Sequence, residues 1–114
     1  MMPKEEAMRR YGRVIGLKPE GVVLYERLHS DPWPDVVAAL QRAGIYNFTI
    51  YRYRNLLFSY FEYHGNDLAA DEARMAADPR VKEWLELCNP LQEPLAERQP
   101  DEWWMVIPEV YHSD

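Results

Sequence analysis

Cysteine is nearly absent from this sequence, which contains only Cys88, and no apolar run approaches the roughly 18 residues that a membrane-spanning helix requires. One cysteine can form neither a disulfide within the chain nor a cysteine metal cluster. The first residues also lack the apolar stretch that is typical of a signal peptide. We therefore expect a cytoplasmic protein with no membrane partner and a reduced Cys88.

Basic residues are in the minority, with 13 Lys and Arg against 19 Asp and Glu, and the net charge is −6. Nucleic-acid-binding proteins present a basic surface to phosphates, so we expect no nucleic-acid partner. Glycine-rich phosphate loops and the G-x-S-x-G motif are also missing, which argues against phosphoryl transfer and serine hydrolysis. The three histidines, His29, His64 and His112, do not have the spacing of a helical zinc motif. We expect no metal and no other cofactor.

Aromatic residues, in contrast, are abundant: 4 Trp, 8 Tyr and 3 Phe make up 13 % of the 114 residues. Tyrosine and tryptophan combine an apolar ring with a polar group, and both often line sites where a ligand is stacked and hydrogen-bonded. An acidic, aromatic-rich chain favours a neutral polar ligand, such as a sugar, over an anion. The alternative is a core built from large rings.

Prolines, glycines and the spacing of apolar residues divide the chain into short elements. We expect strands at Tyr11–Leu17, Ile45–Tyr53, Leu56–Tyr63, Trp103–Val106 and Val110–His112, and helices from Pro19 to about His29, from Pro34 to Gly44, from Asp67 to Ala77 and from Pro79 to about Cys88. Arg54 and Asn55 form the tight turn of a hairpin. Residues 90–102 are expected to be a loop.

This order of elements is typical of an α+β, ferredoxin-like fold (β-α-β-β-α-β), a four-stranded antiparallel sheet with helices on one face. A chain of 114 residues has room for a single domain, and residues 1–9 are expected to be a flexible tail. The second face of the sheet must then be covered by a partner subunit or line a ligand cleft.

The apolar positions of the helices predict which sides face the core. We expect the inward positions to be Leu24, Leu28, Val36, Val37, Leu40, Val81, Trp84, Leu85 and Cys88. Because Cys88 lies on such an apolar stripe, it is expected to be a buried and unreactive thiol.

His29 is the best candidate for acid–base chemistry in the sequence. It ends a helix, and Tyr25 lies one turn earlier on the same face. An imidazole titrates near neutrality and can both donate and accept a proton at cellular pH. The alternative is a histidine that only complements the dipole at the end of its helix.

Other polar and aromatic side chains are weaker candidates. Glu62 lies within an aromatic strand, where it either binds a ligand hydroxyl on the open face of the sheet or is an ordinary solvated carboxylate. Trp33, Trp84 and one of Trp103 and Trp104 could stack on a sugar ring, because neighbouring strand residues face opposite ways. Core packing is the alternative for each tryptophan.

Six segments between Arg10 and the end of the chain form a more specific pattern. They are Tyr25-x-x-x-His29-x-x-x-Trp33-Pro34, Ile50-Tyr51, Leu57–Tyr63, Asp78-Pro79 with Trp84, Glu102-Trp103-Trp104 and Glu109–His112. Together these segments resemble the L-rhamnose mutarotase family. The Y-x-x-x-H-x-x-x-W-P block is the most specific part of the resemblance.

The resemblance implies a ferredoxin-like fold of the dimeric α/β barrel type, which forms a homodimer through its sheets. It implies an isomerase that interconverts the α and β anomers of a 6-deoxyhexose, most simply L-rhamnose, without a cofactor. His29 would be the proton donor and Tyr25 would bind the sugar. The position of Phe48 and the pair Trp84-Leu85 would also contact the substrate.

Two of these positions differ from the family pattern. Phe48 stands where the family typically has a tyrosine, and Trp84-Leu85 stands where it often has two tryptophans. Because sites that hydrogen-bond a hydroxyl discriminate strongly between substrates, the sugar could be L-fucose or another deoxy-sugar. A non-catalytic sugar-binding module, a cofactor-independent monooxygenase and a purely structural dimer are the alternatives.

Overall fold

The computed structural model describes residues 8–114, and most of the expected tail lies outside this range. The strands are β1 (Arg9–Leu17), β2 (Ile45–Tyr53), β3 (Leu56–Tyr63), β4 (Gln92–Glu93) and β5 (Met105–Ile107). The α-helices are α1 (Val22–Ser30), α2 (Pro34–Arg42), α3 (Leu68–Ala76) and α4 (Pro79–Cys88), and the 3₁₀ helices are η2 (Pro19–Gly21) and η3 (Asn89–Leu91). Among residues 8–114, every helix falls short of the length and apolar character that a membrane span requires.

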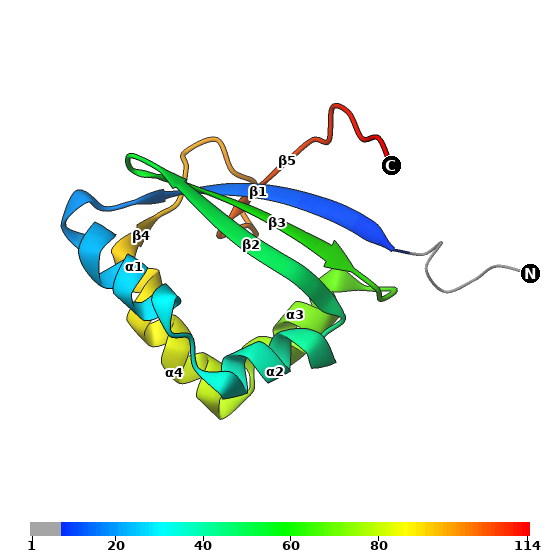
Figure 1. Ribbon diagram of the computed structural model, residues 1–114, viewed down its shortest axis with the longest axis horizontal. Helices are drawn as coiled ribbons and strands as arrows, with labels where there is room; N and C mark the ends of the chain where they lie inside the picture. Colours follow the sequence, from blue (N-terminus) through cyan, green and yellow to red (C-terminus); the bar gives the residue numbers. More distant parts are fainter. Residues whose placement is uncertain (1–7) are drawn as a thin grey trace, which may run out of the picture.

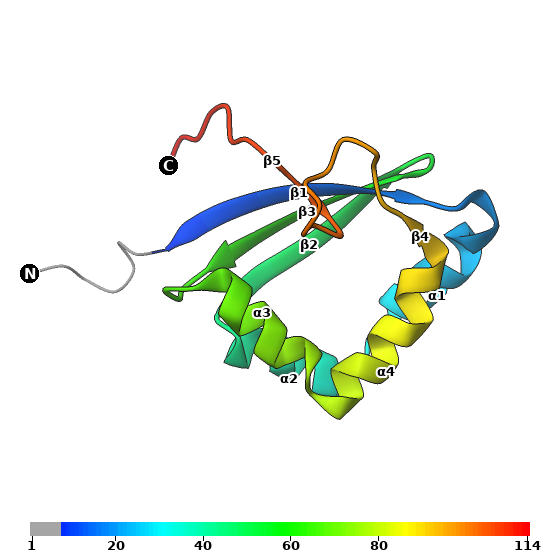
Figure 2. The ribbon, with the colours of Figure 1, turned by 180° about the vertical axis from the view of Figure 1, so that it is seen from behind.

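The strands form one antiparallel sheet in the order β2-β3-β1-β4, and β5 also pairs with β1. Figures 1 and 2 show that the sheet is curled and that all four α-helices lie on one side of it. Helices α1 and α4 lie near the end that carries β4, whereas α2 and α3 lie near the other end. The α+β, ferredoxin-like expectation is confirmed.

The C-terminal region differs from the expectation. Two short strands, β4 and β5, pair with β1, and β4 begins inside the expected loop. Val110–His112 is not a strand, so that prediction is wrong. Pro108 directly follows β5 and has no N–H to continue the ladder, which ends the pairing there. At the other terminus Arg9 already belongs to β1 and not to a tail.

β4 approaches the end of β1 very closely. Gly16 is opposite Glu93, and Leu17 is opposite Gln92. A Cβ atom at position 16 would collide with the carbonyl oxygen of Glu93, so glycine is required at this contact. The close pairing fixes Gln92 beside the sheet, and its side chain is buried.

A β-bulge interrupts the pairing of β2 with β3 between Tyr46 and Thr49. Asn47, inside the bulge, has a left-handed backbone with φ of 52°. Side chains of a strand alternate between faces, and an extra residue shifts this alternation by one. As a result Ile45 and Phe48, which are three positions apart, both line the cavity on the helix side of the sheet.

The core consists of two clusters of buried side chains. The first contains Ile15, Leu17, Tyr25, Val36, Leu57, Trp84 and Cys88. The second contains Ala43, Ile45, Phe61 and Tyr63. Burial raises the pKa of Cys88 to about 11, which leaves a neutral thiol, as expected from the sequence.

Two residues expected in the core are on the surface instead. Leu24 is 43 % exposed and Val37 is 39 % exposed. In α1 the inward position is taken by Tyr25, which is 3 % exposed, because the α-helix begins only after η2 and its inward stripe contains Val22, Tyr25 and Leu28.

Candidate functional site

A cavity of about 530 Å³ lies between the helix-facing side of the sheet and the helices. This volume is within the usual range for small-molecule sites. Tyr25, His29, Phe48 and Trp84 all line the cavity. The structure therefore brings the candidate proton-transfer histidine together with three of the candidate sugar-binding residues, whereas Trp33 and Glu62 do not line the cavity.

The imidazole of His29 is held in one orientation at the end of α1. Its ring stacks on Tyr25, with 4.1 Å between ring centroids, and meets the ring of Trp84 edge-on at 5.1 Å. The Nδ1 atom lies 2.8 Å from the carbonyl oxygen of Tyr25. Because a carbonyl only accepts hydrogen bonds, Nδ1 carries the proton, and Nε2 has no partner among residues 8–114.

The surroundings of His29 keep its ring neutral. Burial disfavours the imidazolium and lowers the pKa of His29 from its ordinary value, and the hydrogen bond to the Tyr25 carbonyl opposes this effect only in part. At neutral pH the unprotonated Nε2 is therefore available as a base. Asp31, with a non-helical backbone, ends α1 directly after this turn, so the ring stands at the end of the helix.

Tyr25 is held by a chain of two hydrogen bonds. Trp103 donates from Nε1 to Oε1 of Gln92 over 2.7 Å, and Nε2 of Gln92 lies 3.2 Å from the hydroxyl oxygen of Tyr25. The first bond fixes the orientation of the Gln92 amide, so that its NH₂ group donates to Tyr25. The Tyr25 hydroxyl then accepts this bond and retains its own proton for a ligand. Burial raises the pKa of Tyr25 well above its ordinary value, so the phenol stays protonated.

No sequence motif pointed to Gln92. It lies in a segment expected to be a loop, and only the pairing of β4 with β1 buries it. Trp103 and Trp104 both line the cavity, so the expectation that only one of them can do so is wrong. The two residues precede β5 and are not in a strand, and strand alternation does not apply to them.

Trp33 stands behind the cavity wall and does not line the cavity. Its ring meets Trp84 edge-on at 5.2 Å, and the guanidinium of Arg80 lies 3.9 Å from its centroid. Trp33 thus supports Trp84, which faces the cavity.

Glu62 lies on the opposite side of the sheet from the cavity. Along β3 the buried residues are Leu57, Ser59, Phe61 and Tyr63, and Glu62 falls on the other face because side chains alternate. Its carboxylate accepts hydrogen bonds of 2.7 Å from Tyr60 and from Asn47, which lower the pKa of Glu62. The structure does not bring Glu62 to His29.

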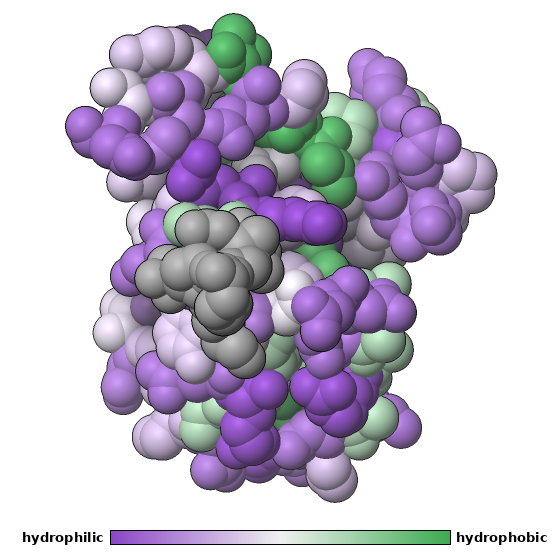
Figure 3. All heavy atoms as spheres, turned by 90° about the vertical axis from the view of Figure 1, so that its right-hand side faces the viewer, coloured by the Kyte–Doolittle hydropathy of each residue, from purple (hydrophilic) through white to green (hydrophobic). Residues whose placement is uncertain are grey.

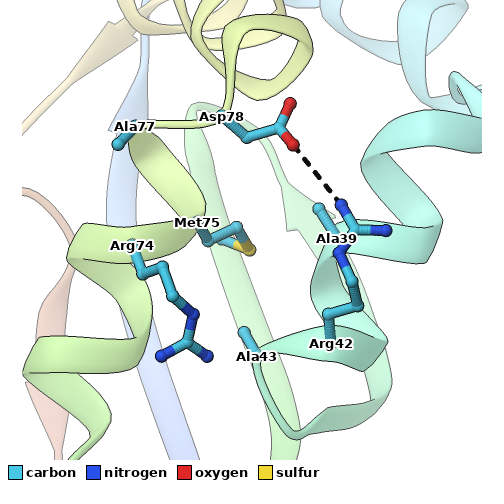
Figure 4. A pocket seen from close by; sticks show the side chains of 7 residues that line it. All are labelled: Ala39, Arg42, Ala43, Arg74, Met75, Ala77 and Asp78. Carbon is cyan, nitrogen blue, oxygen red and sulfur yellow. Dashed lines mark hydrogen bonds and ion pairs between the residues drawn. The ribbon is translucent and has the colours of Figure 1, made fainter.

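A second cavity of about 450 Å³ lies between α2 and the α3–α4 corner (Figure 4). It has no aromatic lining, and its Arg42 is paired with Asp78 at 3.4 Å. Arg74, also at this cavity, is paired with Asp71 at 2.7 Å. Across residues 8–114 no three His, Cys, Asp or Glu side chains gather in a metal-binding arrangement.

Comparison with known proteins finds relatives over most of the chain. The sequence matches the family model for L-rhamnose mutarotase over residues 10–113. An L-fucose mutarotase from Xanthomonas campestris is 37 % identical over 110 residues, which cover 92 % of this chain and 88 % of that protein. An L-rhamnose mutarotase from Phocaeicola vulgatus is 29 % identical over 109 residues, which cover 94 % of this chain and 100 % of that protein.

Solved structures share the fold. The L-rhamnose mutarotase of Formosa agariphila superposes with a TM-score of 0.68 at 20 % identity, over 93 % of this chain and 99 % of that chain. The tetracenomycin F2 cyclase of Streptomyces glaucescens gives a TM-score of 0.65 at 16 % identity, over 92 % and 95 % of the two chains. The sequence matches confirm the resemblance seen in the motifs, and this chain belongs to the L-rhamnose mutarotase family.

Proposed function

We propose that this chain interconverts the α and β anomers of a 6-deoxyhexose by general acid–base ring opening, with His29 as the residue that moves the proton. The observation that carries the proposal is the Nε2 atom of a neutral, fixed imidazole, which faces an aromatic-walled cavity and has no hydrogen-bond partner in the described part of the chain. L-Rhamnose is the first candidate substrate because the matching family model and the Phocaeicola vulgatus and Formosa agariphila proteins carry that name.

The reaction needs only a proton shuttle. Nε2 of His29 takes the proton of the anomeric hydroxyl, and the C1–O5 bond breaks as the C1 aldehyde forms. The imidazolium then gives the proton to O5. After rotation about the C1–C2 bond, the same steps run in reverse and close the ring on the other face. General acid–base catalysis of this kind contributes on the order of 10²–10⁴-fold.

The other cavity residues have binding roles in this proposal. The Tyr25 hydroxyl, which keeps its proton, donates a hydrogen bond to a sugar oxygen near the anomeric carbon. Trp84 presents an apolar wall to the ring and to the C6 methyl group. Phe48 also lines the cavity, and Trp33 contributes only by supporting Trp84. Glu62 has no role in this site.

L-Fucose is a second candidate substrate. The Xanthomonas campestris relative, at 37 % identity, carries the name L-fucose mutarotase. Phe48 also lacks the hydroxyl that the family typically places there. Both observations favour a site whose hydroxyl contacts differ from those of the L-rhamnose enzymes.

Saturation-transfer NMR tests the proposal directly, because it measures exchange between the two anomeric protons. Catalytic amounts of the protein should accelerate this exchange for L-rhamnose, L-fucose or both. His112→Asn is a suitable control, since His112 is exposed and lies outside the cavity. Sugar binding without accelerated exchange would instead identify a non-catalytic module.

We also propose that the protein is a homodimer that buries the face of the sheet opposite the helices. Tyr51 and Tyr53 on this face are 66 % and 60 % exposed, and Tyr46 is also exposed. Exposed apolar patches of this kind usually mark an interface. Figure 3 views the end of the molecule where β1 begins, and there the surface is mostly hydrophilic with apolar patches mainly in the upper half.

A further inference from the structure

The cavity contains an ion pair that the proposed reaction does not use. Arg13 on β1 and Glu72 on α3 both line the cavity. Nη1 and Nη2 of Arg13 lie 2.7 Å and 3.1 Å from the two carboxylate oxygens of Glu72, which is a bidentate pair. The side chains are only 17 % and 31 % exposed.

The environment of this ion pair is not favourable for the stability of the folded state. The guanidinium lies over the ring of Phe61 at 5.0 Å from its centroid, and Nε of Arg13 is buried with no partner among residues 8–114. A buried donor without a partner destabilises the folded state, and a partly buried ion pair gains little over apolar packing. Features that violate the rules of stability in this way are expected at functional sites.

The pair also has capacity for a ligand. Nη1 and Nη2 each carry a second N–H group, and each carboxylate oxygen of Glu72 has a further lone pair. A sugar hydroxyl both donates and accepts, and can bind between the two groups. Because the charges of Arg13 and Glu72 cancel, the pair suits a neutral polyol better than an anionic sugar.

The ion pair and His29 lie at different parts of the cavity. The guanidinium of Arg13 lies over the ring of Phe61, which also meets the ring of Phe48. His29 instead stacks on Tyr25 and meets Trp84, and both groups line the same cavity. A sugar with its anomeric carbon at His29 therefore extends its far side toward Arg13 and Glu72.

We propose that the Arg13–Glu72 pair binds the hydroxyl at C4 of the sugar, across the ring from the anomeric carbon, and thereby determines which C4 epimer the site accepts. This inference rests on the proposed function, because His29 defines where the anomeric carbon lies. The configuration at C4 is one of two differences between L-rhamnose and L-fucose. Phe48, whose ring also contacts Phe61 at 6.0 Å, lies near the same part of the cavity.

Sugars that differ only at C4 provide the test. L-Rhamnose pairs with 6-deoxy-L-talose, and L-fucose pairs with 6-deoxy-L-glucose. Anomer exchange and equilibrium binding are measured by NMR for each epimer pair, with the wild-type protein and with Arg13→Met combined with Glu72→Met. Replacing both partners leaves no uncompensated charge. In the double variant, the preference for one C4 epimer over the other, measured as the ratio of their exchange rates and of their affinities, should weaken at least tenfold.

The matched control is Glu26→Met combined with Arg52→Met, which removes an ion pair that also links a helix to the sheet but lies outside the cavity. This control should keep the wild-type preference between the C4 epimers. If the Arg13 and Glu72 double variant does not fold, Glu72→Gln provides the second measurement, since it keeps the shape and removes the charge. The preference of the Glu72→Gln variant for one C4 epimer should also weaken.

Three results would overturn the inference: a wild-type protein that does not distinguish the C4 epimers, a double variant that distinguishes them as the wild type does, or an equal change in the control. The proposed function fails separately. A wild-type protein that binds sugars with an Arg13-dependent C4 preference, yet does not accelerate exchange, would refute the mutarotase proposal and support this one.

Discussion

The imidazole of His29 lies stacked on the ring of Tyr25, and its Nδ1–H group binds the backbone carbonyl of the same tyrosine. One helical turn thus fixes the position and the tautomer of the histidine. The same contact is compatible with a purely structural role at the end of α1. Substitution of His29 distinguishes a catalytic from a structural role.

His29→Asn should reduce anomer exchange by about 10²-fold or more, because asparagine forms hydrogen bonds but does not exchange a proton near neutral pH. The variant should still bind sugar through Tyr25 and Trp84. The free energy of unfolding should change by no more than about 1 kcal/mol. NMR exchange and thermal melting measure both effects, and full exchange in a destabilised variant would contradict the catalytic role.

Exchange should remain fast at slightly acidic pH and decline only below the ordinary pKa of histidine. The reason is that burial lowers the pKa of His29, and Nε2 stays unprotonated to a lower pH. The pH dependence of stability has a defined sign. Because the unfolded chain binds this proton more readily, the free energy of unfolding falls as the pH drops from the pKa of His29 in the unfolded chain toward its pKa in the folded protein. A rate–pH profile tests this, and a decline beginning above pH about 6.5 would contradict it.

Gln92→Leu should destabilise the protein by about 1–3 kcal/mol, because Tyr25 and Trp103 both lose a buried hydrogen-bond partner. Exchange should also slow, since the Tyr25 hydroxyl is no longer oriented. Combining Gln92→Leu with Tyr25→Phe in a double-mutant cycle measures the coupling. Strictly additive effects on the exchange rate would show that Gln92 does not act through Tyr25.

Phe48→Tyr should change the preference between sugars more than it changes stability. The ring volume is nearly kept, and Phe48 is already 42 % exposed. A new hydroxyl at the cavity gains a partner only with a sugar that has an oxygen nearby. Exchange rates for L-rhamnose and L-fucose should therefore shift relative to each other. An unchanged ratio would exclude Phe48 from substrate contact.

Sedimentation at micromolar concentration should show a particle of twice the 13.5 kDa chain mass. Tyr51→Glu should shift this equilibrium toward the monomer, because it places a charge on the face expected to be buried in the dimer. Glu20→Gln, on the exposed surface of η2, is a control that should leave it unchanged. A wild-type particle of 13.5 kDa would refute the dimer.

Elements that depend on local signals were predictable from the sequence. The hairpin turn at Arg54 and Asn55, the proline starts of α2 and α4, and the pair of Tyr25 and His29 all follow from neighbouring residues. Sequence motifs also predicted the residues of α1 and α4 that line the cavity.

Features that depend on distant pairing could not be found in this way. Gln92 enters the site only because β4 pairs with the end of β1. Arg13 and Glu72 are 59 positions apart, and nothing local to either one predicts their contact. Glu62 could be assigned to a face only once the cavity was located on the other side of β3.

The close contact at Gly16 has a consequence for natural variants of this protein. Even an alanine there would push β4 outward, and Gln92 would lose its position although the sheet could still form. Position 16 touches no proposed substrate atom and holds no chemistry of its own. Variation at this site would nevertheless be expected to produce folded alleles with slower exchange, which a survey restricted to ligand-contacting residues would classify as harmless.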